Sequence, residues 1–323
     1  MSFINLVENK INLGINQKFV SIIGSAPSKG ARSPALWNKA FLNLKMNMKM
    51  FPLDVKFKNI GKLIKSLKKN KNFYASAITI PHKEKIIKYL DKIDQSASEI
   101  GSVNLIVKEK NELKGYNTDS LGFLFTLKKV DKKIKNLLIF GCGGAGKACI
   151  IATKNRYPKA NIYLFNRNTK KLIKFYKKIK INKKNIKIIK NYKNLQSLEK
   201  LDLIINTTQL GFDLEISTIK SNFKYFSPIS KSEIEFDKLK TREKISNSII
   251  NNLIETLDFL KANSNAIIFD IIYKPSKTIL MQIAEKIGMK SINGLEMNYM
   301  QAVEAFKIVN KEISLKKIIK VMQ

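Results

Sequence analysis

The stretch "NLLIFGCGGAGKACIIATKN", residues 136–155, decides the fold of this protein. An apolar run predicts a buried strand, a cluster of glycines predicts a tight turn, and the residues beyond it predict a helix. Gly141, Gly143 and Gly146 fit the pattern G-x-G-x-x-G. The first glycine permits the turn, the second lets backbone approach a pyrophosphate, and the third lets helix and strand pack closely. The contacts expected from this turn are Gly141, Gly143, Gly144, Ala145 and Gly146.

The free N–H groups at the start of such a helix can bind phosphates. The stretch therefore predicts a dinucleotide site, although a glycine turn of this kind can also be purely structural. The strand before the turn and the helix after it favour the dinucleotide site.

Strand-like and helix-like segments alternate on both sides of this turn. Strands are predicted before it at residues 19–24, 47–55 and 72–80, with a helix at 33–44 capped by Ser33 and two further strands within 102–119. Apolar runs spaced for parallel strands follow at residues 161–168, 185–190, 201–208 and 266–273, and residues 298–323 are predicted helical. Successive βαβ units place the chain in the α/β class.

The strand after the glycine turn, "NIYLFNRNTKK" at residues 161–171, favours NADP over NAD. An NAD site usually has Asp or Glu about 20 residues beyond the glycines, where the carboxylate binds the ribose 2′-hydroxyl. Here Asn166, Arg167 and Thr169 occupy that region, and it contains no acid. A guanidinium forms charge-assisted bonds to a 2′-phosphate. The two lysines that follow are expected to be a solvated helix start.

The composition bounds the partners of the protein. Its 323 residues include 60 Lys and Arg against 25 Asp and Glu, a net charge of +35. The lysines are spread along the chain with abundant Asn and Ile, so we expect no nucleic-acid partner. A basic surface still attracts an anionic substrate and cofactor.

The sequence also predicts the cellular location of the protein. No stretch of eighteen apolar residues predicts a membrane span, and the first residues contain no apolar signal-peptide core. Cys142 and Cys149 are expected to be free thiols rather than metal ligands. We therefore expect a cytoplasmic protein without a metal site.

Eight motifs follow one another along the chain: "ITIPHKE", "IGSVN", "GYNTDSLGF", "FGCGGAGKA", "NRNTKK", "DLIINTTQLG", "FDIIYKPSKTIL" and "NGLEMNYMQAVEAF". In these motifs and their order the chain resembles the shikimate dehydrogenase family, from about residue 18 to residue 309. The resemblance implies a substrate-binding catalytic α/β domain at residues 1–120, completed by C-terminal helices within 295–323. It implies a Rossmann-like, doubly wound NADP-binding domain at 121–294. The activity implied is reversible reduction of 3-dehydroshikimate to shikimate in aromatic amino acid biosynthesis.

The resemblance also implies the roles of single residues. The lysine of the family pattern T-x-P-x-K is catalytic, and here it is Lys83; the carboxylate of N-T-D, here Asp119, positions it. A lysine beside a forming alkoxide can stabilise the charge and exchange a proton. His82, the only histidine, falls at a variable position, and we expect it on the surface with no part in catalysis. The implied substrate contacts are Ser33, Thr79, Asn104, Tyr273 and Gln301, and Gly294 is an implied cofactor contact.

The loop "GSAPSKGARSPALWN", residues 24–38, departs from the family pattern. Ala31 stands where the family has a serine that holds the substrate carboxylate, and the segment is one residue longer. We expect Arg32 or Ser28 to bind the carboxylate instead. Gly30, Ala77 and Leu105 are further departures. A quinate or aminoshikimate dehydrogenase therefore stays open as an alternative, as does a nucleotide-binding module without catalytic activity.

Residues 212–265 lengthen the connection between "NTTQLG" and "AIIFDIIY" beyond that usual in the family. This insertion is polar and is predicted to be partly helical. We expect a surface excursion near the cofactor domain, and the sequence does not reveal its purpose. The sequence also leaves open whether the protein is a monomer or a homodimer.

Overall fold

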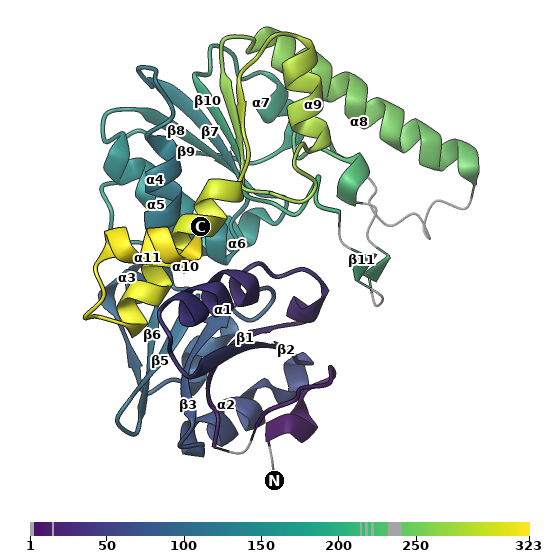
Figure 1. The fold of residues 1–323 in the computed structure, drawn as a ribbon. Helices are drawn as coiled ribbons and strands as arrows, with labels where there is room; N and C mark the ends of the chain where they lie inside the picture. Colours follow the sequence, from purple (N-terminus) through teal and green to yellow (C-terminus); the bar gives the residue numbers. More distant parts are fainter. Residues whose placement is uncertain (1–2, 15, 214, 217–218, 221–222, 232–240) are drawn as a thin grey trace. The chain divides into compact units, whose positions relative to one another are not determined.

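The structure, a computed structural model, describes residues 3–14, 16–213, 215–216, 219–220, 223–231 and 241–323 (Figure 1). The chain divides into two compact units. Unit 1 comprises Met1–Gly122 and Tyr299–Gln323, and unit 2 comprises Phe123–Asn298. Each unit is built on a six-stranded sheet with helices packed against it. The predicted α/β class is confirmed.

Unit 1 has a mixed sheet in the order β2-β1-β3-β5-β6-β4. Its strands are β1 (Lys18–Gly24), β2 (Met48–Asp54), β3 (Phe73–Ile78), β4 (Lys92–Ile93), β5 (Leu105–Glu109) and β6 (Glu112–Tyr116). Strand β1 pairs in parallel with β2 and β3, whereas β5 is antiparallel to β3 and β6. Six of the seven residues of β1 are buried, which is why this strand is an almost continuous apolar run.

The helices of unit 1 come from both ends of the chain. They are α1 (Ser33–Asn43), α2 (Ile60–Lys69), α3 (Gln95–Ile100), the start of α4 (Asp119–Leu127), most of α10 (Leu295–Val309) and α11 (Leu315–Met322). Short 3-10 turns lie at Phe3–Leu6, Pro27–Lys29, Phe57–Asn59 and Lys85–Tyr89. Helix α1 begins at Ser33 with Arg32 at the capping position, so the expected Ser33 cap is displaced by one residue.

Aromatic packing fixes the C-terminal helices to α1. The Trp37 indole donates a hydrogen bond to the Ala302 carbonyl at 3.2 Å, and its ring centroid lies 5.0 Å from that of Phe306. Both side chains are almost completely buried. Because large buried aromatics contribute much of the packing energy of a core, this contact holds α10 in unit 1. It thereby places Gln301 beside Thr118, which lies 183 residues earlier in the chain.

Unit 2 has a wholly parallel sheet in the order β14-β13-β10-β7-β8-β9. Its strands are β7 (Asn136–Phe140), β8 (Asn161–Phe165), β9 (Ile186–Ile189), β10 (Leu203–Asn206), β13 (Ile267–Asp270) and β14 (Ser291–Ile292). The chain builds the sheet outward from β7 to β9 and then returns to build it outward from β10 to β14. This is the doubly wound order predicted, and its switch point lies between β7 and β10.

The remaining elements of unit 2 cover this sheet and extend from it. The helices are α5 (Gly144–Arg156), α6 (Thr169–Lys178), α7 (Tyr192–Gln196), α8 (Arg242–Ala262) and α9 (Ile279–Lys286). The insertion also contains the short strands β11 (Glu215–Ile216) and β12 (Ile219–Lys220) and a 3-10 turn at Phe223–Tyr225. Cys142 and Cys149 are both buried, and they form no disulfide with each other. Within the described ranges no helix is long and apolar enough to span a bilayer.

The insertion is only in part the surface excursion expected from the sequence. Its predicted helical part is confirmed as α8, which reaches beyond the sheet in Figure 1. Residues 226–230, by contrast, are all buried, and Phe226 and Ile229 have no exposed surface. The expectation of a surface excursion is wrong for this segment because its residues are buried and Ile229 belongs to the unit 2 core. Residues 232–240 lie outside the described residues.

Candidate active site

Lys83 and Asp119 form an ion pair in unit 1. The Lys83 Nζ lies 2.6 Å from Asp119 Oδ2, and the two side chains are 17% and 5% exposed. Lys83 follows the end of β3, and its carbonyl accepts a hydrogen bond from the Val103 amide at 2.8 Å. Asp119 is the first residue of α4. A pair so shielded from solvent is little screened by salt, so the carboxylate holds the ammonium in one position.

Asn104 lies at the centre of the polar side chains around this pair. Its Nδ2 lies 3.0 Å from Asp119 Oδ1, 2.9 Å from Thr118 Oγ1 and 3.3 Å from Gln301 Oε1. Its Oδ1 accepts the Thr118 amide hydrogen at 2.8 Å. An amide nitrogen has two hydrogens, so it can serve two of these three acceptors at once. The contact to Gln301 is the longest and is therefore the one most easily exchanged for a ligand.

Thr118 joins this cluster although the sequence did not single it out. Its hydroxyl donates to the Gln301 carbonyl at 2.9 Å, and the residue is fully buried. Asn117 supports the same turn, because its Oδ1 accepts the Asp119 amide hydrogen at 3.0 Å. Both residues belong to the N-T-D motif, which was the available signal. Lys83, Asn104, Asp119 and Gln301, four of the residues expected from the resemblance, thus lie together in unit 1.

Ser33 and Thr79 lie near the ends of neighbouring elements of unit 1. Ser33 is the buried first residue of α1. Thr79 follows β3, and its amide donates to the Ile23 carbonyl at 2.9 Å. A Cβ on Gly24 would lie 2.4 Å from Thr79 Cγ2, so only glycine allows the end of β1 to pass this closely. Thr79 therefore has a fixed backbone position beside the loop that departs from the family pattern.

Within that loop Ser28 is already engaged. Its amide donates to Asp54 Oδ1 at 2.9 Å and its hydroxyl donates to Asp54 Oδ2. A substrate carboxylate at this hydroxyl would face the carboxylate of Asp54, and like charges at contact distance repel. This pairing argues against Ser28 as the carboxylate contact expected from the sequence. Arg32, the other residue expected in that role, is half-buried at the start of α1.

His82 is a core residue, and the expectation that it lies on the surface is wrong. It is 1% exposed, and its Nε2 donates to the Val55 carbonyl at 3.1 Å. Its ring stacks on Phe57 with centroids 6.0 Å apart, and the Lys85 Nζ lies 4.0 Å from the centroid of that phenyl ring. Burial is the main cause that lowers the pKa of His82. The polar sequence "PHKEK" gave no sign that the turn after β3 would direct this one side chain inward.

The glycines of the turn in unit 2 differ in how much space surrounds them. Gly141 has a φ of +102°, and a Cβ there would lie 2.5 Å from Thr207 Oγ1. A Cβ on Gly146 would lie 2.8 Å from the Gly141 carbonyl oxygen. A Cβ on Gly143, by contrast, would meet no atom within 4 Å. Gly144 and Ala145 are the first residues of α5, so the open space at Gly143 adjoins the N-terminus of this helix. The turn therefore has the space and the N–H groups that a pyrophosphate requires.

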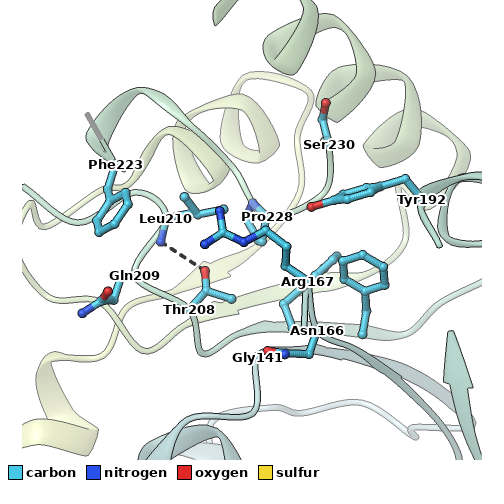
Figure 2. A pocket seen from close by; sticks show the side chains of 12 residues that line it. Gly141, Asn166, Arg167, Tyr192, Thr208, Gln209, Leu210, Phe223, Pro228 and Ser230 are labelled. Carbon is cyan, nitrogen blue, oxygen red and sulfur yellow. Dashed lines mark hydrogen bonds between the residues drawn. The ribbon is translucent and has the colours of Figure 1, made fainter. Parts of the chain in front are cut away.

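A cavity of about 200 Å³ lies beside this turn (Figure 2). It is at the carboxyl ends of β7, β8 and β10, next to the switch point of the sheet, where open α/β sheets bind ligands. Its lining residues are Phe140, Gly141, Phe165, Asn166, Arg167, Tyr192, Thr208, Gln209, Leu210, Phe223, Pro228 and Ser230.

Three of the expected cofactor contacts, Gly141, Asn166 and Arg167, line this cavity. Asn166 Oδ1 accepts the Cys142 amide hydrogen at 3.1 Å and so ties the end of β8 to the glycine turn. The exposed Arg167 directs its side chain into the cavity in Figure 2. Thr169 is the first residue of α6, and its hydroxyl donates to the Lys190 carbonyl at 3.4 Å. A cationic, partly apolar cavity beside the turn fits the adenosine end of NADP.

Tyr273 and Gly294 lie on the far side of the switch point from Arg167, in the part of unit 2 formed by β13 and β14. Tyr273 is half-buried and follows β13. A Cβ on Gly294 would lie 1.8 Å from the Ile271 carbonyl oxygen, so close backbone packing is sufficient to require glycine there.

Asp270, which the sequence did not single out, holds the neighbouring loops. It accepts hydrogen bonds from Asn206 Nδ2 at 3.0 Å, Thr278 Oγ1 at 2.8 Å and the Ile272 amide at 3.0 Å. Complete burial raises the pKa of Asp270 to about 6. Asn206 in turn accepts the Thr208 amide hydrogen and donates to the Leu210 carbonyl, so the cavity loop after β10 is fixed to this carboxyl group. The place of Asp270 in the motif "FDIIYKPSKTIL" was the sequence signal that could have identified it.

The doubly wound sheet, the glycine turn and the cationic cavity define a dinucleotide-binding protein of the dehydrogenase class. Residues 22–106 match the family model of the shikimate dehydrogenase substrate binding domain. The chain is 32% identical over 297 residues to the shikimate dehydrogenase (NADP(+)) of Methanocaldococcus jannaschii, covering 90% of each chain. It belongs to the shikimate dehydrogenase family.

Other relatives agree with this assignment. The enzyme of the same name from Caldanaerobacter subterraneus is 31% identical over 291 residues, again 90% of each chain. A solved shikimate dehydrogenase in complex with NADP+ is 27% identical, with a TM-score of 0.69 over 95% of this chain and 94% of that one. The crystal structure of the Aquifex aeolicus enzyme is also 27% identical, with a TM-score of 0.71 over 97% of this chain and 100% of that one.

Proposed function

We propose that the protein is an NADP-dependent oxidoreductase that reversibly reduces 3-dehydroshikimate to shikimate in the biosynthesis of aromatic amino acids. The observation that carries the proposal is the shielded Lys83–Asp119 pair, with Asn104 and Gln301 beside it, in a chain of this family. Bound NADP supplies or accepts the hydride. The protein must then manage a proton at the carbonyl oxygen of the substrate.

Lys83 has this role in the proposed mechanism. Its ammonium hydrogen-bonds to the carbonyl oxygen of the substrate, stabilises the negative charge as it forms, and gives up a proton to it. Asp119 keeps the ammonium in place through the 2.6 Å contact. In the oxidative direction the same group receives the proton. The two side chains are nearly shielded from water, which strengthens the electrostatic stabilisation.

The remaining contacts divide between the two units. In unit 1, Ser33, Thr79, Asn104 and Gln301 bind substrate hydroxyl or carboxylate groups, and Arg32 replaces the serine hydroxyl lost at Ala31. In unit 2, Tyr273 lies near the ligands, the turn from Gly141 to Gly146 takes the pyrophosphate, and Asn166, Arg167, Thr169 and Gly294 take the rest of NADP. Residues 1–120 with 295–323 thus form the substrate domain, and residues 121–294 form the cofactor domain. We place the reaction in the cytoplasm, a location that the two reduced cysteines support.

One observation favours a second candidate, a dehydrogenase for quinate or aminoshikimate. Ala31 and Ala77 stand at positions where the family has polar contacts, and the Ser28 hydroxyl is used by Asp54. The part of the site that recognises the carboxylate and the ring substituents therefore differs from the family pattern. The reaction type is unaffected, because Lys83 and Asp119 are both present.

A substrate panel tests the two candidates. Shikimate, quinate and aminoshikimate are each oxidised with NADP+ and with NAD+, and kcat/KM is compared. We expect shikimate with NADP+ to give the highest value. A higher value for quinate or aminoshikimate would move the assignment to the second candidate, and no turnover of any of the three would refute both.

A further inference from the structure

The insertion supplies one wall of the cavity that contains Arg167. Phe223, Pro228 and Ser230 belong to residues 212–265 and line this cavity. In Figure 2 the side chains of Arg167 and Tyr192 point toward the part of the cavity where Pro228 lies. Strand ends form the opposite wall, so the insertion closes a space that the sheet alone would leave open.

Hydrogen bonds to the rest of unit 2 hold this wall in position. The Gly211 amide donates to the Phe223 carbonyl at 2.7 Å, which joins the wall to the loop after β10. Asn252 of α8 bonds to both backbone groups of Ser227: its Oδ1 accepts the amide hydrogen at 2.9 Å and its Nδ2 donates to the carbonyl at 3.2 Å. Both residues are fully buried. Removing a partner from such a pair leaves unsatisfied buried groups, so α8 determines where the wall lies.

A second bond fixes the far end of the wall. The Ser230 hydroxyl donates to Glu255 Oε2 of α8 at 2.5 Å, and Ser230 is 1% exposed. Ser227 and Ser230 therefore bracket Pro228 and Ile229 and attach the segment to one helix at two points. A segment fixed in this way can present an ordered surface to a ligand without a further loss of conformational entropy.

We propose that the insertion is part of the cofactor site: residues 223–230 form the wall that contacts the adenosine end of the dinucleotide, and α8 holds this wall in place. This inference rests on the proposed function, which puts NADP in unit 2. Arg167 and Tyr192 select the adenosine end. The cavity extends from the ends of β7 and β10 to these two residues, which follow β8 and β9. The phenyl ring of Phe223 and the ring of Pro228 provide the apolar surface that a purine needs.

Binding of cofactor fragments to a matched pair of variants tests this wall. Phe223→Ala removes a lining ring, whereas Tyr225→Ala removes an exposed ring two residues further along the same turn, outside the lining set. The probes are NADP+, adenosine 2′,5′-bisphosphate for the adenosine end and nicotinamide mononucleotide for the other end, titrated by calorimetry. We expect Phe223→Ala to weaken binding of the first two probes about tenfold and to leave the third unchanged. Tyr225→Ala should change none of them.

Asn252→Ala tests the role of α8 as a positioning element. This residue is absent from the cavity lining, yet its loss frees the Ser227 backbone, so binding of adenosine 2′,5′-bisphosphate should weaken while that of nicotinamide mononucleotide does not. Thermal unfolding establishes that the variant is folded; if it is not, Phe223→Ala decides alone. Unchanged binding of the bisphosphate by Phe223→Ala overturns the inference. A wild type that binds this probe but oxidises no shikimate refutes the proposed function and not the wall.

Discussion

The Lys83 ammonium lies 2.6 Å from the Asp119 carboxylate, although the two residues are 36 positions apart in the sequence. Lys83 follows β3, and Asp119 begins α4 after β6. The antiparallel pairing of β5 with both β3 and β6 brings these ends together. In a chain with 60 Lys and Arg residues, this placement distinguishes one lysine from those on the surface.

Replacing Lys83 should slow the chemical step. Lys83→Ala is expected to lower kcat for shikimate oxidation at least about a hundredfold, since general acid–base catalysis contributes this much or more. Binding of shikimate, measured by equilibrium titration, should change much less. Lys88→Ala, a change of an exposed lysine in the following turn, is the matched control and should retain kcat. A Lys83→Ala variant with wild-type kcat would contradict the assignment.

Replacing Arg32 should weaken substrate binding without slowing turnover. The guanidinium is proposed to replace the serine hydroxyl lost at Ala31 as the carboxylate contact. Arg32→Ala should therefore raise KM for shikimate roughly tenfold at nearly constant kcat, the pattern of lost uniform binding. Lys29→Ala removes an exposed charge from the same loop and serves as the control. Equal KM values in the two variants would mean that the carboxylate is held elsewhere.

Replacing Arg167 should weaken the binding of NADP+ much more than that of NAD+. A charge-assisted contact contributes on the order of 1.5–3 kcal/mol, which corresponds to roughly ten- to a hundredfold in affinity. Arg167→Ala should weaken NADP+ binding by about this factor and leave NAD+ binding nearly unaffected, as measured by fluorescence titration. Lys170→Ala, an exposed lysine three residues later, should affect neither strongly. A variant that loses both dinucleotides equally would show that Arg167 does not contact the 2′-phosphate.

His82 should make the protein less stable in acid. Burial lowers its pKa below the ordinary 6.5, so the unfolded chain takes up a proton at a pH where the folded protein does not. The free energy of unfolding therefore falls as the pH drops below 6.5. His82→Phe keeps a ring of similar size and removes this dependence. When the pH is lowered from about 7.5 to about 5.5, the melting temperature of the wild type should fall further than that of the variant.

The same variant distinguishes a structural from a catalytic histidine. At about pH 7.5, His82→Phe should keep most of its turnover, because the Nε2–Val55 bond is a packing contact. If His82→Phe lowers kcat more than Lys83→Ala, the assignment of the proton-transfer residue is wrong.

Asp270 should have the opposite effect on stability. Burial raises its pKa from 3.8 to about 6, so between these two pH values the folded protein binds more protons than the unfolded chain. The free energy of unfolding therefore falls by about 3 kcal/mol in all as the pH rises through this range. Asp270→Asn should abolish this part of the pH dependence in urea unfolding between pH 4 and 7. Asp258→Asn, an exposed carboxylate on α8, should retain it. Identical pH profiles for the wild type and Asp270→Asn would contradict the prediction.

Local sequence pattern was sufficient for most of the fold. The strands, the glycine turn and the helical C-terminus were predicted because apolar periodicity and glycine spacing act over a few residues. Gly141 was predictable for the same reason, since its φ of +102° is a local requirement. The start of α1 was misplaced by one residue because helix ends depend on weak and local capping energies.

The environment of single side chains depended on long-range contacts. His82 stands in a polar stretch, and only its meeting with Val55 and Phe57, more than twenty residues earlier, makes it a core residue. Ser28 looked free to bind a carboxylate until Asp54 was found beside it.

The amino-acid sequence by itself determined the α/β class, the dinucleotide turn and the family to which the chain belongs. Only the tertiary structure decided that Asn104 joins Asp119 to Gln301, that Asp270 fixes the loop after β10, and that the insertion lines the cavity of Arg167. The physical reason is one of range. Backbone propensity and hydrophobic periodicity are set by neighbours in the chain, whereas hydrogen-bond partners and burial are set by segments that the sheets bring together.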